Sequence, residues 1–292
     1  MTTQFSTTHR PERDGSEPQD NTTSASTRHS TPTTESVGNA RTLSLRPVRT
    51  FALIALPLGW SILSIPLLLG LPIEPFALIT TLFALLLPSL LIIRRESGGS
   101  GVRALLRDAI RLPRPLWWVL AAVTVVPTIT WLVANALGGA EPLTTELMIG
   151  YSGYVVGVAV AASLVNVWEE TAWTGFAQRR LMARWGVIRG SAATAALFAG
   201  IHLPLVFQGP ITASSVLLGV AVLIGTAIGL RLIIGYLDGW TGGSLLTIGL
   251  LHASFNSTAV FVAPSYDWLR WAVTVAIGLT IALTAGRRRR QR

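Results

Sequence analysis

From Phe51 onward the chain consists of long apolar runs separated by short polar stretches. The runs are continuous rather than alternating, which favours helices, because open strands cannot satisfy their backbone hydrogen bonds in lipid. Several runs approach the roughly 20 residues that span a bilayer as a helix. We expect eight spans, give or take one, at residues 51–71, 75–93, 116–137, 147–176, 190–207, 213–235, 243–262 and 268–286. The pattern predicts an all-α membrane protein, a polytopic bundle of about eight transmembrane helices.

The two ends of the chain have a different composition. Residues 1 to about 45 are rich in Ser, Thr, Pro, Asn and Gln, and such a segment cannot bury enough apolar surface to offset its ordering entropy. The last residues, 287–292, are nearly all arginine. We therefore expect a disordered cytoplasmic tail at 1–45, a transmembrane helical domain at 46–286 and a basic C-terminal tail at 287–292.

Charge supports the membrane assignment and gives it an orientation. Only 13% of the residues are charged, against about 25% in soluble domains. Arginines fill the connections 94–115 and 177–189 and the C-terminus, whereas the alternate connections carry acidic residues. Because positive loops stay on the cytoplasmic side, both termini are expected there. The net charge of +9 is thus explained without nucleic acid, and the absence of cysteine excludes disulfides and thiol chemistry.

Several polar residues lie inside predicted spans. Glu169 and Glu170 are adjacent in one span, His202 lies in the next, and His252 and Asn256 lie four residues apart on a third. A charge near the bilayer centre costs roughly 2.5–3.5 kcal/mol, so such residues suggest a function. Counted from the cytoplasmic ends of their spans, these side chains fall at a similar depth, about 15 to 21 Å. With no cation nearby, we expect at least one of the two glutamates to be protonated.

This layer of polar groups suits peptide hydrolysis. A desolvated carboxylate can be a general base for water, and an imidazole can help hold that water or carry a proton. A His and an Asn on one helix face can stabilise a developing oxyanion. Two histidines and a glutamate also form a catalytic zinc set, which would comprise Glu169, His202 and His252. The residue types leave both mechanisms open, so a divalent metal such as zinc is an alternative.

At these residues the chain resembles the CPBP family of intramembrane proteases, which includes type II CAAX prenyl endopeptidases and bacterial bacteriocin-processing and immunity proteins. The family pattern is Glu-Glu-x-x-x-Arg, then Phe-x-x-x-His, then His-x-x-x-Asn. Its counterparts are Glu169-Glu170, Phe198 with His202, and His252 with Asn256, within a protease-like core at about 150–260.

The resemblance implies a role for each of these residues. Glu169 activates water with help from His202, Glu170 orients the site, and His252 and Asn256 stabilise the oxyanion. It also implies a protein or peptide substrate, contact with membrane lipid and a bacterial plasma membrane.

The chain departs from the pattern at Thr174, where the motif has arginine. Threonine offers neither charge nor reach, and Arg179 is more than two helical turns from Glu170. Arg231, on another span, is a candidate replacement, and an arginine introduced at 174 is expected either to raise cleavage or to lower the pKa of the glutamates. The departure keeps two alternatives to an endopeptidase open. One is a catalytically weakened member acting as a membrane binding or immunity protein, and the other is a proton-coupled transporter.

Overall fold

The computed structural model describes residues 44–156, 165–209 and 211–290. Within these ranges the regular elements are helical, and the β-contact present there is an isolated bridge between Ala140 and Val262. The predicted all-α fold is confirmed. Up to residue 43, the tail predicted at 1–45 lies outside the described residues.

Six helical stretches of the described chain are long and apolar enough to cross a membrane, and a further apolar helix, Leu245–Phe261, is shorter. The six are Arg46–Leu69, Glu74–Ala109, Trp117–Ala136, Val165–Phe207, Ala213–Trp240 and Pro264–Arg287. Large apolar side chains cover their outer surface, and Leu53 and Leu68 are 75% and 82% exposed. Exposed apolar faces of this extent fit contact with lipid. The chain is a multi-pass membrane protein.

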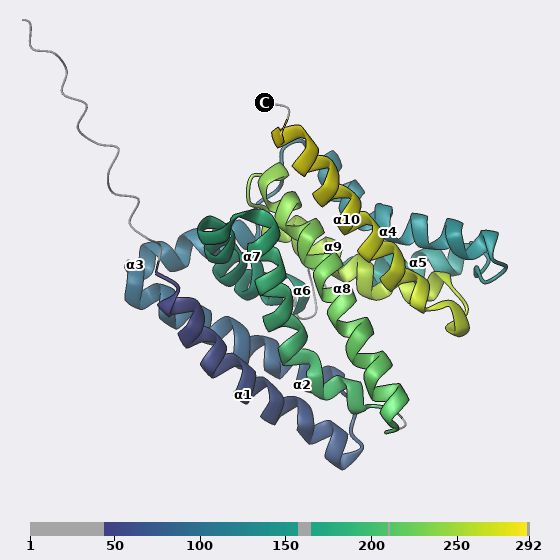
Figure 1. Cartoon of the computed structure of the whole chain (residues 1–292), viewed down its shortest axis with the longest axis horizontal. Coiled ribbons are helices and arrows are strands. Elements are labelled where there is room, and N and C mark those ends of the chain that lie inside the picture. The colour runs from purple at the N-terminus through teal and green to yellow at the C-terminus, as the bar shows by residue number, and fades with distance from the viewer. Residues whose placement is uncertain (1–43, 157–164, 210, 291–292) are drawn as a thin grey trace, which may run out of the picture. The chain divides into compact units, whose positions relative to one another are not determined.

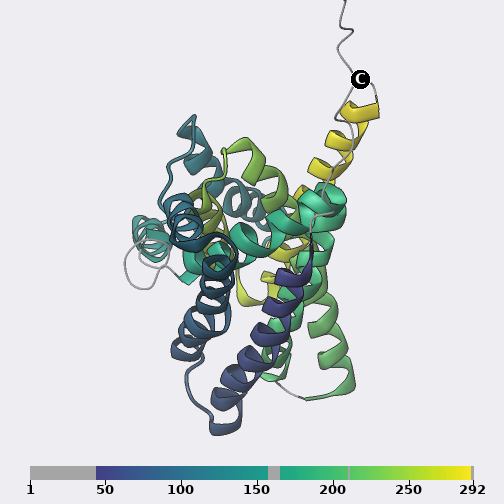
Figure 2. The same cartoon turned by 90° about the vertical axis from the view of Figure 1, so that its left-hand side faces the viewer.

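The elements follow one another from α1 near the N-terminus to α10 near the C-terminus. In order they are α1 (Arg46–Leu69), α2 (Glu74–Ile79), η1 (Thr80–Leu86), α3 (Leu87–Ala109), α4 (Trp117–Ala136), α5 (Thr145–Val156), α6 (Val165–Glu170), η3 (Thr171–Gln178), α7 (Arg179–His202), η4 (Leu203–Phe207), α8 (Ala213–Trp240), α9 (Leu245–Ser257), η5 (Thr258–Phe261), η6 (Pro264–Tyr266) and α10 (Trp268–Arg290). Elements η1 and η3 are π-helical turns. Helix α1 ends at Gly70, and the chain then turns and runs back beside α1 as α2, η1 and α3 (Figure 2). Helix α8 packs against both α7 and α10 (Figure 1).

The predicted spans 147–176 and 190–207 begin and end at different residues in the structure. Residues 157–164 lie outside the described residues, and α6 and η3 continue directly into α7. The chain turns inside α7 at Gly186, whose φ of 78° lies in the left-handed region that glycine adopts easily. Across this reversal Gln178 Nε2 donates to Ser191 Oγ at 3.1 Å. The reversal forms a hairpin that brings residues 169 and 202 to the same level.

Helix α9 packs closely against the arm that carries the two glutamates. A Cβ added to Gly249 would lie 2.8 Å from Val167 Cα, so only a glycine permits this approach. Val167 lies two residues before Glu169, and Gly249 lies three before His252. This contact therefore sets the distance between the glutamates and the histidine.

The charged loops gather in two groups. Arg179 pairs with Asp108 and Asp238 at 2.7 and 2.8 Å, and Arg111 Nη1 donates to Gly242 O. At the far end of α4, a helix of 20 residues or about 30 Å, the amide of Glu141 donates to Phe261 O. The contacts of Arg111 and Arg179 thus lie near the beginning of α4, and that of Glu141 lies near its end.

Candidate active site

Both glutamates are buried at the point where α6 becomes the π-helical turn η3. Glu169 is 6% exposed and Glu170 is fully buried. A π-turn widens the helix by one residue and often occurs at functional sites. Here it follows the carboxylates directly and contains Thr174.

Glu170 accepts four hydrogen bonds from three other residues. Arg231 Nη1 donates to Oε2 and Nη2 to Oε1, both at 2.7 Å. Thr174 Oγ1 donates to Oε2 at 2.5 Å, and His252 Nδ1 lies 2.8 Å from Oε1. A carboxylate has about four lone-pair positions, so this one is saturated.

Arg231 reaches the glutamate from α8 and is itself fully buried. Its guanidinium carbon lies 4.2 Å from the centre of the Phe198 ring, which adds a cation–π contact to the ion pair. Nη1 also lies 3.3 Å from Thr174 Oγ1. The assumption that no cation is near the glutamates is therefore wrong, because Arg231 supplies one from another helix. The reason for expecting a protonated glutamate is lost for Glu170.

Glu169 and His202 face each other across the hairpin. Their nearest atoms, Oε1 and Nε2, are 3.7 Å apart, and the His202 side chain is 25% exposed. The other ring nitrogen, Nδ1, lies 2.7 Å from the backbone oxygen of Phe198. Because a carbonyl only accepts, Nδ1 carries a proton there, and the neutral ring presents an unprotonated Nε2 to Glu169.

Phe198 links the two histidines. Its ring centre lies 4.4 Å from that of His202 and 5.7 Å from that of His252. The rings of His202 and His252 therefore both lie beside one aromatic side chain, and each histidine faces one of the two glutamates. Asn256 is partly buried one turn beyond His252, and among the described residues it makes no side-chain hydrogen bond to the cluster.

The zinc set of Glu169, His202 and His252 is not supported by this geometry. No three His, Asp or Glu side chains of the described residues converge as metal ligands. Instead, Glu170 and not Glu169 is the carboxylate in contact with His252. We derive no step through a metal.

Arg179 binds charged and backbone groups at one end of the bundle rather than the glutamates. Its guanidinium bonds Asp108, Asp238 and the backbone oxygen of Gly243. The distance argument from the sequence had set this arginine aside, and the structure agrees. Sequence reasoning named Arg231 only as a candidate, and it did not foresee the hydroxyl contact of Thr174.

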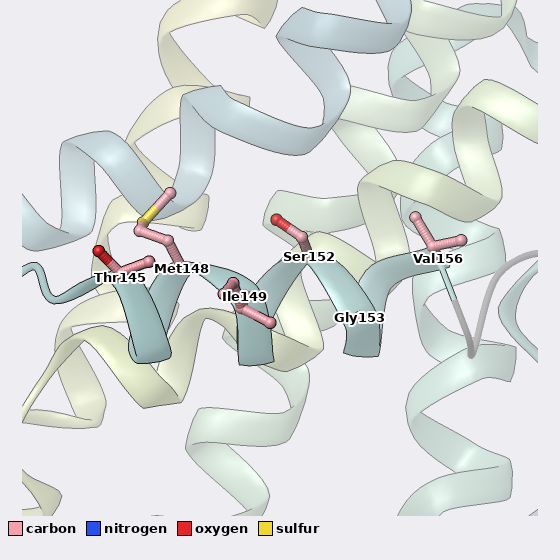
Figure 3. Close-up of a pocket in the computed structure, with 6 residues that line it drawn as sticks. All are labelled: Thr145, Met148, Ile149, Ser152, Gly153 and Val156. Atoms are coloured by element: carbon pink, nitrogen blue, oxygen red, sulfur yellow. The ribbon is translucent and has the colours of Figure 1, made fainter.

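The surface hollows of the described residues include two that lie outside the cluster, on α5 and beside α1. The first, shown in Figure 3, follows one face of α5, and all its labelled lining residues belong to that helix. It contains none of the polar cluster. The second is an apolar groove between α1 and the segment after His202. It is lined by Trp60, Ser64, Leu67, Leu68, Leu203, Pro204, Phe207 and Ile211.

Comparison with protein families agrees with the resemblance. Residues 151–258 match the family model described as type II CAAX prenyl endopeptidase, Rce1-like. That stretch contains both glutamates, both histidines of the cluster, Asn256 and Arg231. Among curated proteins, none matches the chain.

Proposed function

We propose that this chain, whose residues 151–258 form an Rce1-like type II CAAX prenyl endopeptidase domain, hydrolyses a peptide bond within the membrane. The observation that carries the proposal is that the Glu169 carboxylate and the His202 imidazole face each other. A separation of 3.7 Å is too long for a direct hydrogen bond, and one water can bond to both atoms. Glu169 takes a proton from this water as the water oxygen attacks the substrate carbonyl.

The remaining steps use the same residues. Attack forms a tetrahedral oxyanion, to which the amide of Asn256 donates. Glu169 then returns its proton to the leaving amine as the C–N bond breaks, so one water is consumed for each bond cut. His202 holds the water and is exposed enough for a substrate to reach it.

The apolar groove gives a place for the substrate beside the water. Its wall begins at Leu203 and Pro204, directly after His202. We place apolar side chains of the peptide substrate there, since a substrate that enters from the membrane carries such side chains. The enzyme would lie in a bacterial plasma membrane with both termini cytoplasmic.

Proteolysis by purified protein tests the proposal. The wild type in detergent micelles should cleave members of a library of apolar peptides, and Glu169→Gln should lower kcat by roughly 10² to 10⁴, the usual contribution of a general base. Glu96→Gln is the matched control, because Glu96 pairs with Arg180 at the edge of the bundle and should leave kcat unchanged. Full activity of Glu169→Gln would contradict the mechanism.

The alternative of a weakened member rested on Thr174 alone. A guanidinium does reach Glu170, so that alternative has lost its supporting feature. If no peptide of the library is cleaved, a binding or immunity function or a proton-coupled transporter would be preferred.

A further inference from the structure

We infer that Arg231 and Thr174 act as one positioning unit that, through Glu170, holds His252 in a single tautomer with its proton on Nδ1. Arg231 would thereby supply from α8 the guanidinium that the motif places at position 174. The effect on cleavage rests on the proposed function, whereas the state of His252 does not.

The first step is the saturation of Glu170. Both oxygens accept from Arg231, and the remaining positions accept from Thr174 and His252. No lone pair remains to carry a proton of its own, so Glu170 is an ionised, acceptor-only group. The atom of His252 that faces it, Nδ1, must therefore be the donor.

The second step is the rigidity of this arrangement. Arg231 is fully buried, bonds Glu170 in fork geometry and lies over Phe198. Paired forks of this kind fix orientation as well as charge. Glu170 therefore has one position, and the imidazole bonded to it has one orientation.

The third step concerns the small side chain at 174. The hydroxyl of Thr174 donates to Glu170 Oε2 and receives a contact from Arg231 Nη1 at 3.3 Å. Both residues are fully buried. A second guanidinium at 174 would compete for the same carboxylate and repel the first one. The sequence-based expectation that Thr174→Arg raises cleavage is thereby reversed, and we expect a loss.

The consequence is that His252 and Asn256, both on α9, have different hydrogen-bonding roles. In the tautomer that carries its proton on Nδ1, His252 offers a lone pair at Nε2 and no N–H there. Asn256, one turn further, keeps an amide that can donate in every state. Of these two residues on α9, Asn256 would then carry the donor for an oxyanion, and Nε2 of His252 would be an acceptor.

Nitrogen NMR of the whole chain tests the inference without any substrate. The protein is labelled with ¹⁵N-histidine in detergent micelles, and His252 is assigned with variants that remove His9, His29 and His202. In wild type we expect separate signals for a protonated Nδ1 and an unprotonated Nε2. In Arg231→Thr we expect these signals to move towards the average of two exchanging tautomers. An unchanged His252 spectrum in that variant would overturn the inference.

The exchange variant Thr174→Arg/Arg231→Thr keeps the same atoms in the site. We expect it to restore the wild-type His252 signals that each single variant loses, and failure to restore them would show that Arg231 is not standing in for position 174. If Arg231→Thr does not fold, Arg231→Lys decides, because it keeps the charge and loses the fork. A wild-type spectrum for Arg231→Lys would then overturn the inference.

Arg270→Leu is the matched control for removing an arginine. Arg270 also pairs with a carboxylate, Asp267, and lies near an aromatic ring, Phe255, and it makes no hydrogen bond to Glu170 or His252 among the described residues. It should leave the His252 signals unchanged. In cleavage assays a positioning role predicts that Arg231→Lys lowers kcat more than it changes KM. If wild type cleaves no peptide, the proposed function fails while the NMR result still decides the role of Arg231.

Discussion

At the scale of single residues, two neighbouring glutamates have opposite surroundings. Glu170 accepts four hydrogen bonds, whereas among the described residues the polar contact of Glu169 is a long one with a histidine. A saturated carboxylate is fixed and cannot take up a proton without losing a donor. A carboxylate with free lone pairs can accept one. The environment thus separates a structural glutamate from a candidate base.

The hydroxyl of Thr174 can be tested by an isosteric change. Thr174→Val removes a buried hydrogen bond to a charged group and should lower the free energy of unfolding by about 1.5–3 kcal/mol. Thr174→Ser keeps the hydroxyl and should lose less. Thermal unfolding in detergent measures both variants. Equal stability of Val and Ser variants would show that the methyl group, and not the hydroxyl, matters at this position.

The sequence identified most residues of the cluster but not the hydrogen bonds and ion pairs between them. An ionisable residue in an apolar span stands out by itself, so Glu169, Glu170, His202 and His252 could be found without a structure. The pairing of Glu170 with Arg231 joins residues 61 positions apart. Helical spacing gives no information about contacts between two helices of unknown rotation. The sequence argument therefore looked for a cation only on the helix that carries the glutamates, and it found none there.

At the scale of elements, a turn and a glycine contact decide where the side chains meet. Gly186 reverses the chain so that His202 returns to Glu169, and Gly249 lets α9 approach α6. The apolar pattern predicted both helices that flank the reversal. It did not predict that their helical hydrogen bonding would run on through Arg179 and Trp185, because the arginines there suggested an open loop.

Gly249→Ala tests the close approach of α9. The added methyl would meet Val167 Cγ2 at 2.5 Å and its backbone at 2.8 Å, so the helices must separate. We expect about 1–3 kcal/mol lower stability from overpacking, and lower kcat because Glu170 and His252 move apart. Gly239→Ala on α8 is the control, since nothing lies within 4 Å of its added Cβ. Unaltered stability and kcat in Gly249→Ala would contradict this account.

The groove beside His202 predicts a different kinetic effect. Ser64→Trp fills the groove from the side of α1 and should raise KM for apolar peptides several-fold while leaving kcat nearly constant. Ser61→Trp, one turn earlier on the same helix and outside the groove, controls for the added bulk. If both variants have the same KM, the substrate does not bind in this groove.

At the scale of the whole molecule, charged residues of the connections make contacts at both ends of α4. Asp108, Arg179 and Asp238 join the arginine-rich connections, and the backbone contact of Glu141 with Phe261 lies at the other end of α4. Charge along the sequence predicts that the arginine-rich and acidic connections lie on opposite sides, because positive loops are retained on one side of a membrane.

Reporter fusions test the orientation. Fusions after Arg114, Arg184 and Arg292 should report a cytoplasmic position, and fusions near Glu141 and Asp267 an external one, because the two sets of connections are predicted to lie on opposite sides. An alkaline phosphatase and a green fluorescent protein series at each site give opposite signals and control for expression. A cytoplasmic reading near Glu141 would overturn the topology.

The distance in sequence between Glu170 and Arg231 also governs how the protein can be made. At about 5–20 residues per second, roughly 3–12 s separate the synthesis of the two residues, which are 61 positions apart. During that interval the newly made first arm carries a carboxylate whose transfer to the bilayer centre costs roughly 2.5–3.5 kcal/mol. An arginine at position 174 would have entered the membrane on the same helix, already paired. Here the cation arrives with α8, so stable insertion of the arm that bears the two glutamates depends on a helix the ribosome has not yet finished.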